Sequence, residues 1–103
     1  MSPIIIISTF PDKDSLTNSA NQIVKEKLAA CVNVIDITST FFWEGKIENT
    51  PEYLALFKTT EKNKEALKER IRTTHPYDVP EIVELAPSSI NEPYLKWLVE
   101  STN

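Results

Sequence analysis

The chain has 103 residues, of which 41% are hydrophobic and 25% charged, which is typical of one globular domain (residues 1–103) with its own core. Its net charge of -4 weighs against a nucleic-acid partner, since proteins that bind phosphate backbones usually carry a basic stripe. The single cysteine, Cys31, excludes an internal disulfide and fits a reducing compartment. The first residues lack a basic segment and a long apolar run, so we expect a cytoplasmic protein with no signal peptide and no membrane association.

The first third of the chain predicts a strand and then a helix. Residues 4–10 begin with four consecutive isoleucines and end before Pro11, a pattern typical of a strand that is covered on both faces. Residues 12–30 carry apolar side chains at spacings of three and four, which predicts an amphipathic helix. Its N-terminus can be capped by Asp12, Asp14 or Ser15.

The middle of the chain predicts one long β-hairpin around Gly45, the only glycine of the sequence. Both arms, residues 31–43 and 46–60, are rich in β-branched and aromatic side chains, and glycine suits the tight reversal between them. Each arm is about twice the usual strand length of about 5–6 residues, so the hairpin should project beyond the domain. Pro51 cannot donate a ladder hydrogen bond and therefore marks either a bulge or an unpaired edge.

The last third predicts a helix, a strand and a final helix. Thr60 can cap a helix that runs to about Thr74, where the His75-Pro76 pair should end it. Its surface offers three ion pairs at spacing i,i+3, namely Glu61/Lys64, Glu65/Lys68 and Glu69/Arg72. Residues 81–86 predict a fourth strand, and Asn91 can cap the last helix.

The resulting order is β-α-β-β-α-β plus a terminal helix, which predicts an α+β, ferredoxin-like sandwich. In that fold the first and third strands are central and the two main helices cover one sheet face. The other face would then expose apolar side chains, as a subunit interface does. Together with the long hairpin, this predicts a homo-oligomer, although the pattern does not choose between a dimer and a trimer.

Metal-ligating residues are sparse. A closed zinc site needs about four Cys or His ligands at recognisable spacings, whereas this chain has one of each, Cys31 and His75. Cys31 is either a small buried hydrophobe or a soft metal ligand, and His75 either fixes a loop or binds a metal. An oligomer could repeat this set and add hard carboxylate ligands, for which the sequence offers Glu48, Glu52 and Glu81.

Signatures of catalysis are lacking, so we expect a protein that is not an enzyme. There is no Ser/His/Asp arrangement at a nucleophile elbow and no glycine-rich phosphate loop. An acylphosphatase would need a phosphate-binding loop with arginine, but residues 9–13 contain neither glycine nor arginine. The strand carboxylates, among them Glu52, are expected to be solvated. Trp43 at the hairpin tip is expected to pack on a neighbouring subunit.

Five sequence blocks, in this order and at this spacing, resemble the CutA divalent-cation tolerance family. They are LAACVN at 28–33, FWEGKI at 42–47, LFKTT at 56–60, HPY at 75–77 with PEI at 80–82, and YLKWL at 94–98. The resemblance covers the length of the chain. It implies a homotrimer, similar in architecture to the PII signalling proteins, with a role in tolerance of copper and other divalent ions and without enzymatic activity.

The resemblance also implies where the functional residues lie. Copper or another divalent cation would be held by Cys31, His75 and Glu81. A ligand cleft between subunits would contain Trp43, Lys46, Lys58 and Tyr77, and the hairpin tip with Phe42, Trp43 and Gly45 would lie in the subunit interface. An alternative function is a PII-like signalling trimer that binds a small anionic or metabolite ligand in this cleft, near Lys46, Lys58, His75 and Tyr77.

Overall fold

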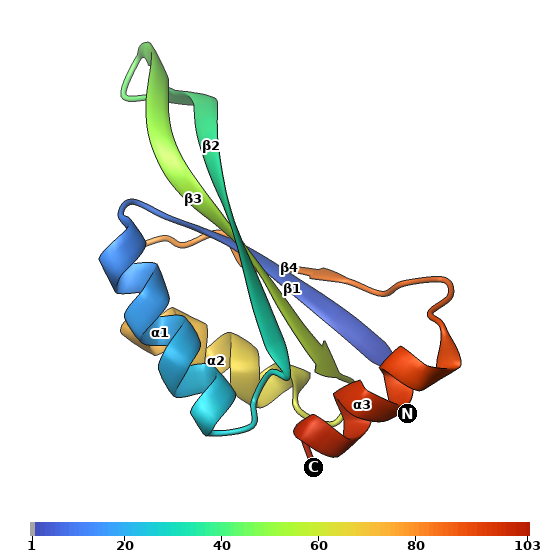
Figure 1. Ribbon diagram of the computed structural model, residues 1–103. Helices are drawn as coiled ribbons and strands as arrows, with labels where there is room; N and C mark the ends of the chain where they lie inside the picture. Colours follow the sequence, from blue (N-terminus) through green and yellow to red (C-terminus); the bar gives the residue numbers. More distant parts are fainter. Residues whose placement is uncertain (1) are drawn as a thin grey trace.

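The structure is a computed structural model that describes residues 2–103 (Figure 1). Its elements in chain order are β1 (Pro3–Phe10), α1 (Lys13–Lys25), β2 (Cys31–Trp43), β3 (Lys46–Thr60), α2 (Lys64–Thr74), β4 (Val83–Leu85) and α3 (Glu92–Ser101). The strands form one antiparallel sheet in the order β2-β3-β1-β4. This confirms the predicted α+β, ferredoxin-like order, with the first and third strands in the centre.

The core lies between one sheet face and the helices α1 and α2, which run along the same side of the sheet (Figure 1). Alternate side chains of β1, among them Ile4 and Ile6, point into it and are at most 2% exposed. Leu16 of α1 and Leu67 of α2 meet them from the helix side and are fully buried. Each such side chain contributes about 1.5–3 kcal/mol when it leaves water, so this layer stabilises the subunit.

The opposite sheet face is left open by α1 and α2. Ile7 of β1 lies between Leu56 of β3 and Val83 of β4 on this face. The edge residues Val83 and Leu85 are 41% and 45% exposed, and Ile35 of β2 is 45% exposed. The face therefore presents apolar side chains to solvent in the isolated subunit, as the fold pattern predicted. The helix α3 and the segment that precedes it cover part of this face near the inner end of β3 (Figure 1).

The predicted hairpin is present and projects from the rest of the molecule (Figure 1). Glu44 and Gly45 have φ of 48° and 80°, so both central residues of the turn are left-handed, as in the two-residue turns that suit twisted hairpins. The pairing of β2 with β3 is unbroken from Cys31 opposite Lys58 to Trp43 opposite Lys46, so the alternative of a bulge at Pro51 is wrong. Because β1 pairs with β3 only as far as Tyr53, Pro51 lies on the predicted unpaired edge.

Helix α1 starts where predicted and ends early. Asp12 caps it by accepting the Ser15 N–H at 2.7 Å. It ends at Lys25 because Lys27 adopts a left-handed φ of 62°. The Leu28 N–H then donates to the Ile23 carbonyl at 3.1 Å, and the Lys27 N–H donates to the Val24 carbonyl at 3.0 Å. These two bonds form a Schellman motif, which usually has glycine at the left-handed position and was therefore not predicted here.

Helix α2 begins at Lys64, so the prediction that Thr60 caps it is wrong. Asn63 holds the N-cap position without a side-chain cap, and Thr60 is the last residue of β3, opposite Pro3. The helix does end at Thr74, since His75 is extended before Pro76. All three predicted ion pairs form, namely Glu61/Lys64, Glu65/Lys68 and Glu69/Arg72.

The last two elements have the predicted type. β4 has three residues rather than six, because β1 pairs only with Val83–Leu85. Asn91 stands at the N-cap of α3 but makes no side-chain capping bond. None of the helices within residues 2–103 is long and apolar enough to cross a membrane.

Candidate functional site

His75 fixes the segment that follows α2 against the end of β1. Its Nε2 lies 2.8 Å from the Thr9 carbonyl oxygen, and its Nδ1 accepts the Tyr77 N–H at 3.0 Å. Because a carbonyl oxygen only accepts, Nε2 carries the proton and the ring is the neutral tautomer. The ring also stacks on Phe10 at 4.2 Å between centroids. Burial lowers the pKa of His75, although the Thr9 carbonyl and Glu52 act in the opposite direction.

Tyr77 joins the same segment to the base of the hairpin. Its hydroxyl donates to Glu52 Oε2 at 2.6 Å, and Glu52 is 8% exposed, so the expectation of a solvated carboxylate is wrong here. The physical reason is register. β1 ends at Phe10, opposite Tyr53, which leaves Glu52 just beyond the end of β1, where the segment with Tyr77 reaches it. Burial and the hydrogen bond to Glu52 raise the pKa of Tyr77 to about 12.

Cys31 and Lys58 are paired neighbours at the inner end of the sheet. They lie opposite each other in the β2–β3 register, and both are half-buried. The Lys58 ammonium lies 5.6 Å from the centroid of the Tyr94 ring on α3, within the range of a cation–π contact. Tyr94 belongs to the YLKWL block of the sequence, and no site role was predicted for it. The contact depends on how α3 folds back over β3, which no local pattern shows.

A sequence model of the CutA1 divalent ion tolerance protein family matches residues 4–101. The chain belongs to the CutA family. It is 46% identical to the divalent-cation tolerance protein CutA of Pyrococcus horikoshii, over 96% of this chain and 97% of that protein. It is 41% identical to the protein of that name from Thermus thermophilus, over 95% of this chain and 96% of the relative.

Solved CutA structures have the same fold. The crystal structure of CutA1 from Pyrococcus horikoshii matches with a TM-score of 0.93 and 45% identity, covering 97% of this chain and 98% of the other. CutA1 from Oryza sativa matches with a TM-score of 0.95 and 40% identity, covering 100% and 95% of the two chains. A structure from Archaeoglobus fulgidus is described as a periplasmic divalent cation tolerance protein. The full Oryza sativa relative is described as chloroplastic, and this chain spans about half of its length. Because CutA proteins are named for different compartments, the cytoplasmic location stays a prediction.

The hairpin tip of this CutA chain exposes large apolar side chains. Phe42, Trp43 and Ile47 are 69%, 59% and 64% exposed. Lys46 pairs with Trp43 next to Gly45, at the far end of β3 from Lys58. At about 3.3 Å per residue, these two lysines lie about 40 Å apart along the strand. Within one subunit, the predicted cleft residues are therefore spread over the length of the hairpin.

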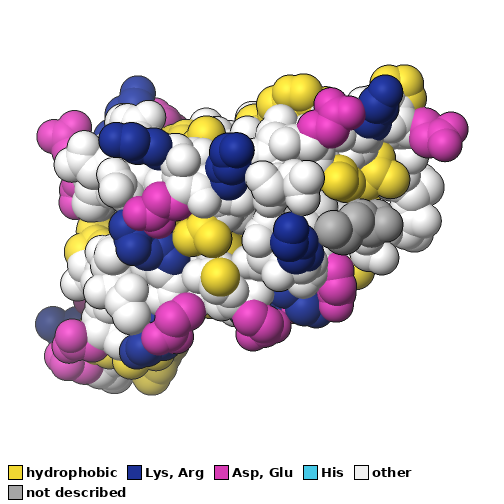
Figure 2. All heavy atoms as spheres, turned by 90° about the horizontal axis from the view of Figure 1, so that it is seen from below, with side chains coloured by type: hydrophobic (Ala, Val, Ile, Leu, Met, Phe, Trp, Pro, Cys, Tyr) yellow, Lys and Arg dark blue, Asp and Glu magenta, His cyan; other side chains and the backbone are white. Residues whose placement is uncertain are grey.

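The predicted metal ligands are not gathered in one subunit. Cys31 lies at the start of β2, His75 follows α2, and Glu81 is exposed between α2 and β4. Within residues 2–103, no three His, Cys, Asp or Glu side chains are grouped so that they could hold a metal ion. Figure 2 shows one face of the molecule, on which basic and acidic side chains are interspersed with small apolar groups. That face carries no basic stripe.

Proposed function

We propose that the protein is a non-enzymatic homotrimer that contributes to divalent-cation tolerance and binds copper or another divalent cation. The observation that carries this proposal is the family match across residues 4–101. The relatives are named for divalent-cation tolerance, and their names do not mention an enzymatic activity. The chemistry of the candidate donors supports the choice of copper, and the exposed apolar surfaces support the assembly.

The assembly has two supports in the isolated subunit. The open sheet face exposes apolar side chains on both edge strands, including Ile35 and Val83. The hairpin tip adds Phe42 and Trp43. Large apolar patches on a small protein usually mark an interface, and closed symmetry allows each subunit to cover the next. We place Phe42, Trp43 and Gly45 in that interface.

The cation site draws on residues that one subunit keeps apart, so symmetry must bring copies together. Cys31 is the first candidate, because it is a free thiol and sulfur is a soft ligand suited to copper. His75 is the second. Its Nε2–H bond to a backbone carbonyl is of the kind that orients metal-binding histidines, but Nδ1 must release the Tyr77 N–H before it can bind a metal. Glu81 supplies an exposed carboxylate.

Calorimetric titration with Cu²⁺ tests the cation site. We expect saturable heat with the wild-type protein, its loss in Cys31→Ala and a weaker binding constant in His75→Ala. Glu81→Gln should weaken binding, whereas Glu100→Gln, an exposed carboxylate on α3, should leave it unchanged. An absence of saturable heat at micromolar Cu²⁺ in the wild-type protein would contradict copper binding.

A small-ligand signalling trimer is the second candidate function, because Lys58 lies against Tyr94 rather than in bulk water. Its cleft would combine residues of different subunits, because Lys58 lies six residues along β3 from the Glu52 that Tyr77 contacts, and twelve residues from Lys46. The distance along β3 requires this arrangement between subunits. A crystal structure of the assembled protein tests it directly. Lys46 close to the Lys58 of a neighbouring subunit would support this cleft, and Lys46 in bulk solvent would exclude it.

A further inference from the structure

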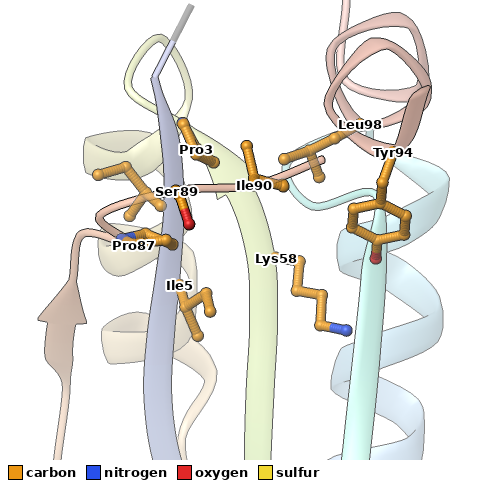
Figure 3. Close-up of a pocket in the computed structure, with 9 residues that line it drawn as sticks. Pro3, Ile5, Lys58, Pro87, Ser89, Ile90, Tyr94 and Leu98 are labelled. Atoms are coloured by element: carbon orange, nitrogen blue, oxygen red, sulfur yellow. The ribbon is translucent and has the colours of Figure 1, made fainter. Parts of the chain in front are cut away.

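A pocket lies at the inner end of the sheet, far from the hairpin tip, between α3, the segment that precedes it, and the ends of β1 and β3 (Figure 3). Its volume is about 220 Å³. Most of its wall is apolar and is formed by Pro3, Ile4, Ile5, Pro87, Ile90 and Leu98. Lys58, Ser89 and Tyr94 are the lining residues with polar side-chain ends.

Lys58 differs from the other half-buried lysines of the protein. Lys64 and Lys68 each pair with Glu84 and with a second glutamate. No carboxylate within residues 2–103 lies at ion-pair distance from Lys58, and its cationic end contacts the ring of Tyr94. Removing an ammonium group from water is unfavourable unless an anion or several hydrogen bonds replace the water. The pocket therefore presents an ammonium group that has no carboxylate partner among residues 2–103 and could pair with an anion.

The other polar group of the pocket is well placed for the same anion. Figure 3 shows the Lys58 side chain extended toward Tyr94, with the phenol oxygen at the end of the ring nearer the amine. An ammonium and a hydroxyl can both donate to one carboxylate. Ile90 and Leu98 lie above Lys58 in this view, with Leu98 beside Tyr94 on α3, and they offer an apolar surface (Figure 3).

We propose that this pocket binds a small monocarboxylate with a compact apolar body, such as an aromatic or branched aliphatic acid. Its carboxylate contacts the Lys58 ammonium and the Tyr94 hydroxyl, and its body packs against Ile90 and Leu98. This ligand carries the opposite charge to a metal cation, so the inference does not depend on the tolerance function. It differs from the cleft of the second candidate function because Lys58 and Tyr94 of one subunit form the whole polar contact.

Size and charge select this class of ligand. The pocket is smaller than the roughly 300–1,000 Å³ of sites for drug-sized ligands, which favours a compact ligand. It offers one cation, which matches a single negative charge. A phosphate group is usually held by arginine or by several donors at once, and this wall is mostly apolar.

Benzoate is a suitable probe, and benzamide is its neutral counterpart of the same shape. Both are titrated into the assembled wild-type protein with EDTA present, and binding is followed by calorimetry and by ligand-observed NMR. We expect saturable binding of benzoate and at least about tenfold weaker binding of benzamide, because the neutral amide loses the charge-assisted hydrogen bond with the Lys58 ammonium. Because EDTA removes free metal, this result is independent of any copper titration.

Three variants locate the site. Lys58→Met keeps most of the side-chain stem and removes the charge, and it should weaken benzoate binding about tenfold or more while leaving benzamide unchanged. Tyr94→Phe should weaken benzoate by a smaller factor. Lys96→Met is the matched control, because Lys96 is exposed on the same helix and does not line the pocket. Equal binding of benzoate and benzamide, equal binding to Lys58→Met and wild type, or no benzoate binding would each overturn the proposal.

Discussion

The two ends of the hairpin differ in burial and in packing partners, although they belong to the same pair of strands. At the inner end, Ala55 and Phe57 of β3 are fully buried between neighbouring strands and the helices. At the outer end, beyond Tyr53, the strands have no third partner, and Phe42 and Trp43 are more than half exposed. The pairing is equally regular along both parts. Backbone pairing alone therefore does not account for the outer end.

The inner end is stabilised by contacts within the subunit, whereas for the outer end we propose stabilisation by neighbouring subunits. The inner end closes a core with α1 and α2, which stabilises the single chain. A two-stranded ribbon in water is marginally stable at best, which is why we propose that the outer end packs on another subunit.

The largest effect is expected in the core. Phe57→Ala removes a fully buried ring and should lower the free energy of unfolding by about 3–5 kcal/mol at any protein concentration. Phe42→Ala, at the tip, should have a smaller effect that grows as the protein becomes concentrated enough to assemble. Chemical denaturation at two protein concentrations measures both. A loss in Phe42→Ala as large as in Phe57→Ala and independent of concentration would remove the contrast.

The second prediction concerns the junction between the two ends. Tyr77→Phe leaves the Glu52 carboxylate buried without its donor and should cost about 1–3 kcal/mol. The folded-state pKa of Tyr77 is raised to about 12, above its ordinary value of 10.0, so its contribution is complete below pH 10 and disappears as the pH rises toward 12. The stability gap between wild type and Tyr77→Phe should therefore shrink over that range. Tyr53→Phe, at a half-buried neighbour, is the control; a gap that stays constant from pH 8 to pH 11.5 would be inconsistent with this hydrogen bond.

The third prediction tests the turn. Gly45→Ala forces a side chain into a left-handed residue and should cost about 1–2 kcal/mol. An added Cβ meets nothing within 4 Å, so the cost comes from the backbone alone. Glu44→Gly should have the opposite sign, since Glu44 is also left-handed. Thermal unfolding of both variants measures the difference, and equal shifts of the same sign would show that the turn has another conformation.

The smallest effect is expected on the helix side, at the end of α1. Lys27→Gly should stabilise the protein by about 0.5–1 kcal/mol, because the left-handed position of the Schellman motif favours glycine. Lys25→Gly, inside the last turn of the helix, should destabilise it by about 1 kcal/mol. Denaturant midpoints of the two variants should therefore move in opposite directions. A shift toward lower stability in both would mean that α1 continues past Lys25.

Much of the fold could be predicted because local pattern and global structure agree. Gly45 and the flanking β-branched arms define the hairpin, and the helix spacings define α1 and α2. The failures occur where a residue acts against its usual preference. Lys27 adopts the left-handed backbone conformation that usually needs glycine, so the sequence did not predict that α1 ends early. Threonine commonly caps helices, but Thr60 is the last residue of a strand.

The sites were less predictable because they depend on contacts between distant segments. The sequence singled out His75 and Tyr77, but the burial of Glu52 follows from where β1 stops and from a segment 25 residues away. The environment of Lys58 follows from the packing of α3 on β3. The sequence shows the type of each side chain. The residue that this side chain contacts depends on the register of the sheet, which the sequence does not show.

The central claim is that the open sheet face and the hairpin tip are assembly surfaces. Light scattering measures the mass in solution directly. The account predicts three times the 11.7 kDa subunit for the wild type, and a mass that falls on dilution at a higher concentration for Trp43→Ala than for wild type. A wild-type mass of 11.7 kDa at micromolar concentration, with the protein folded, would contradict it.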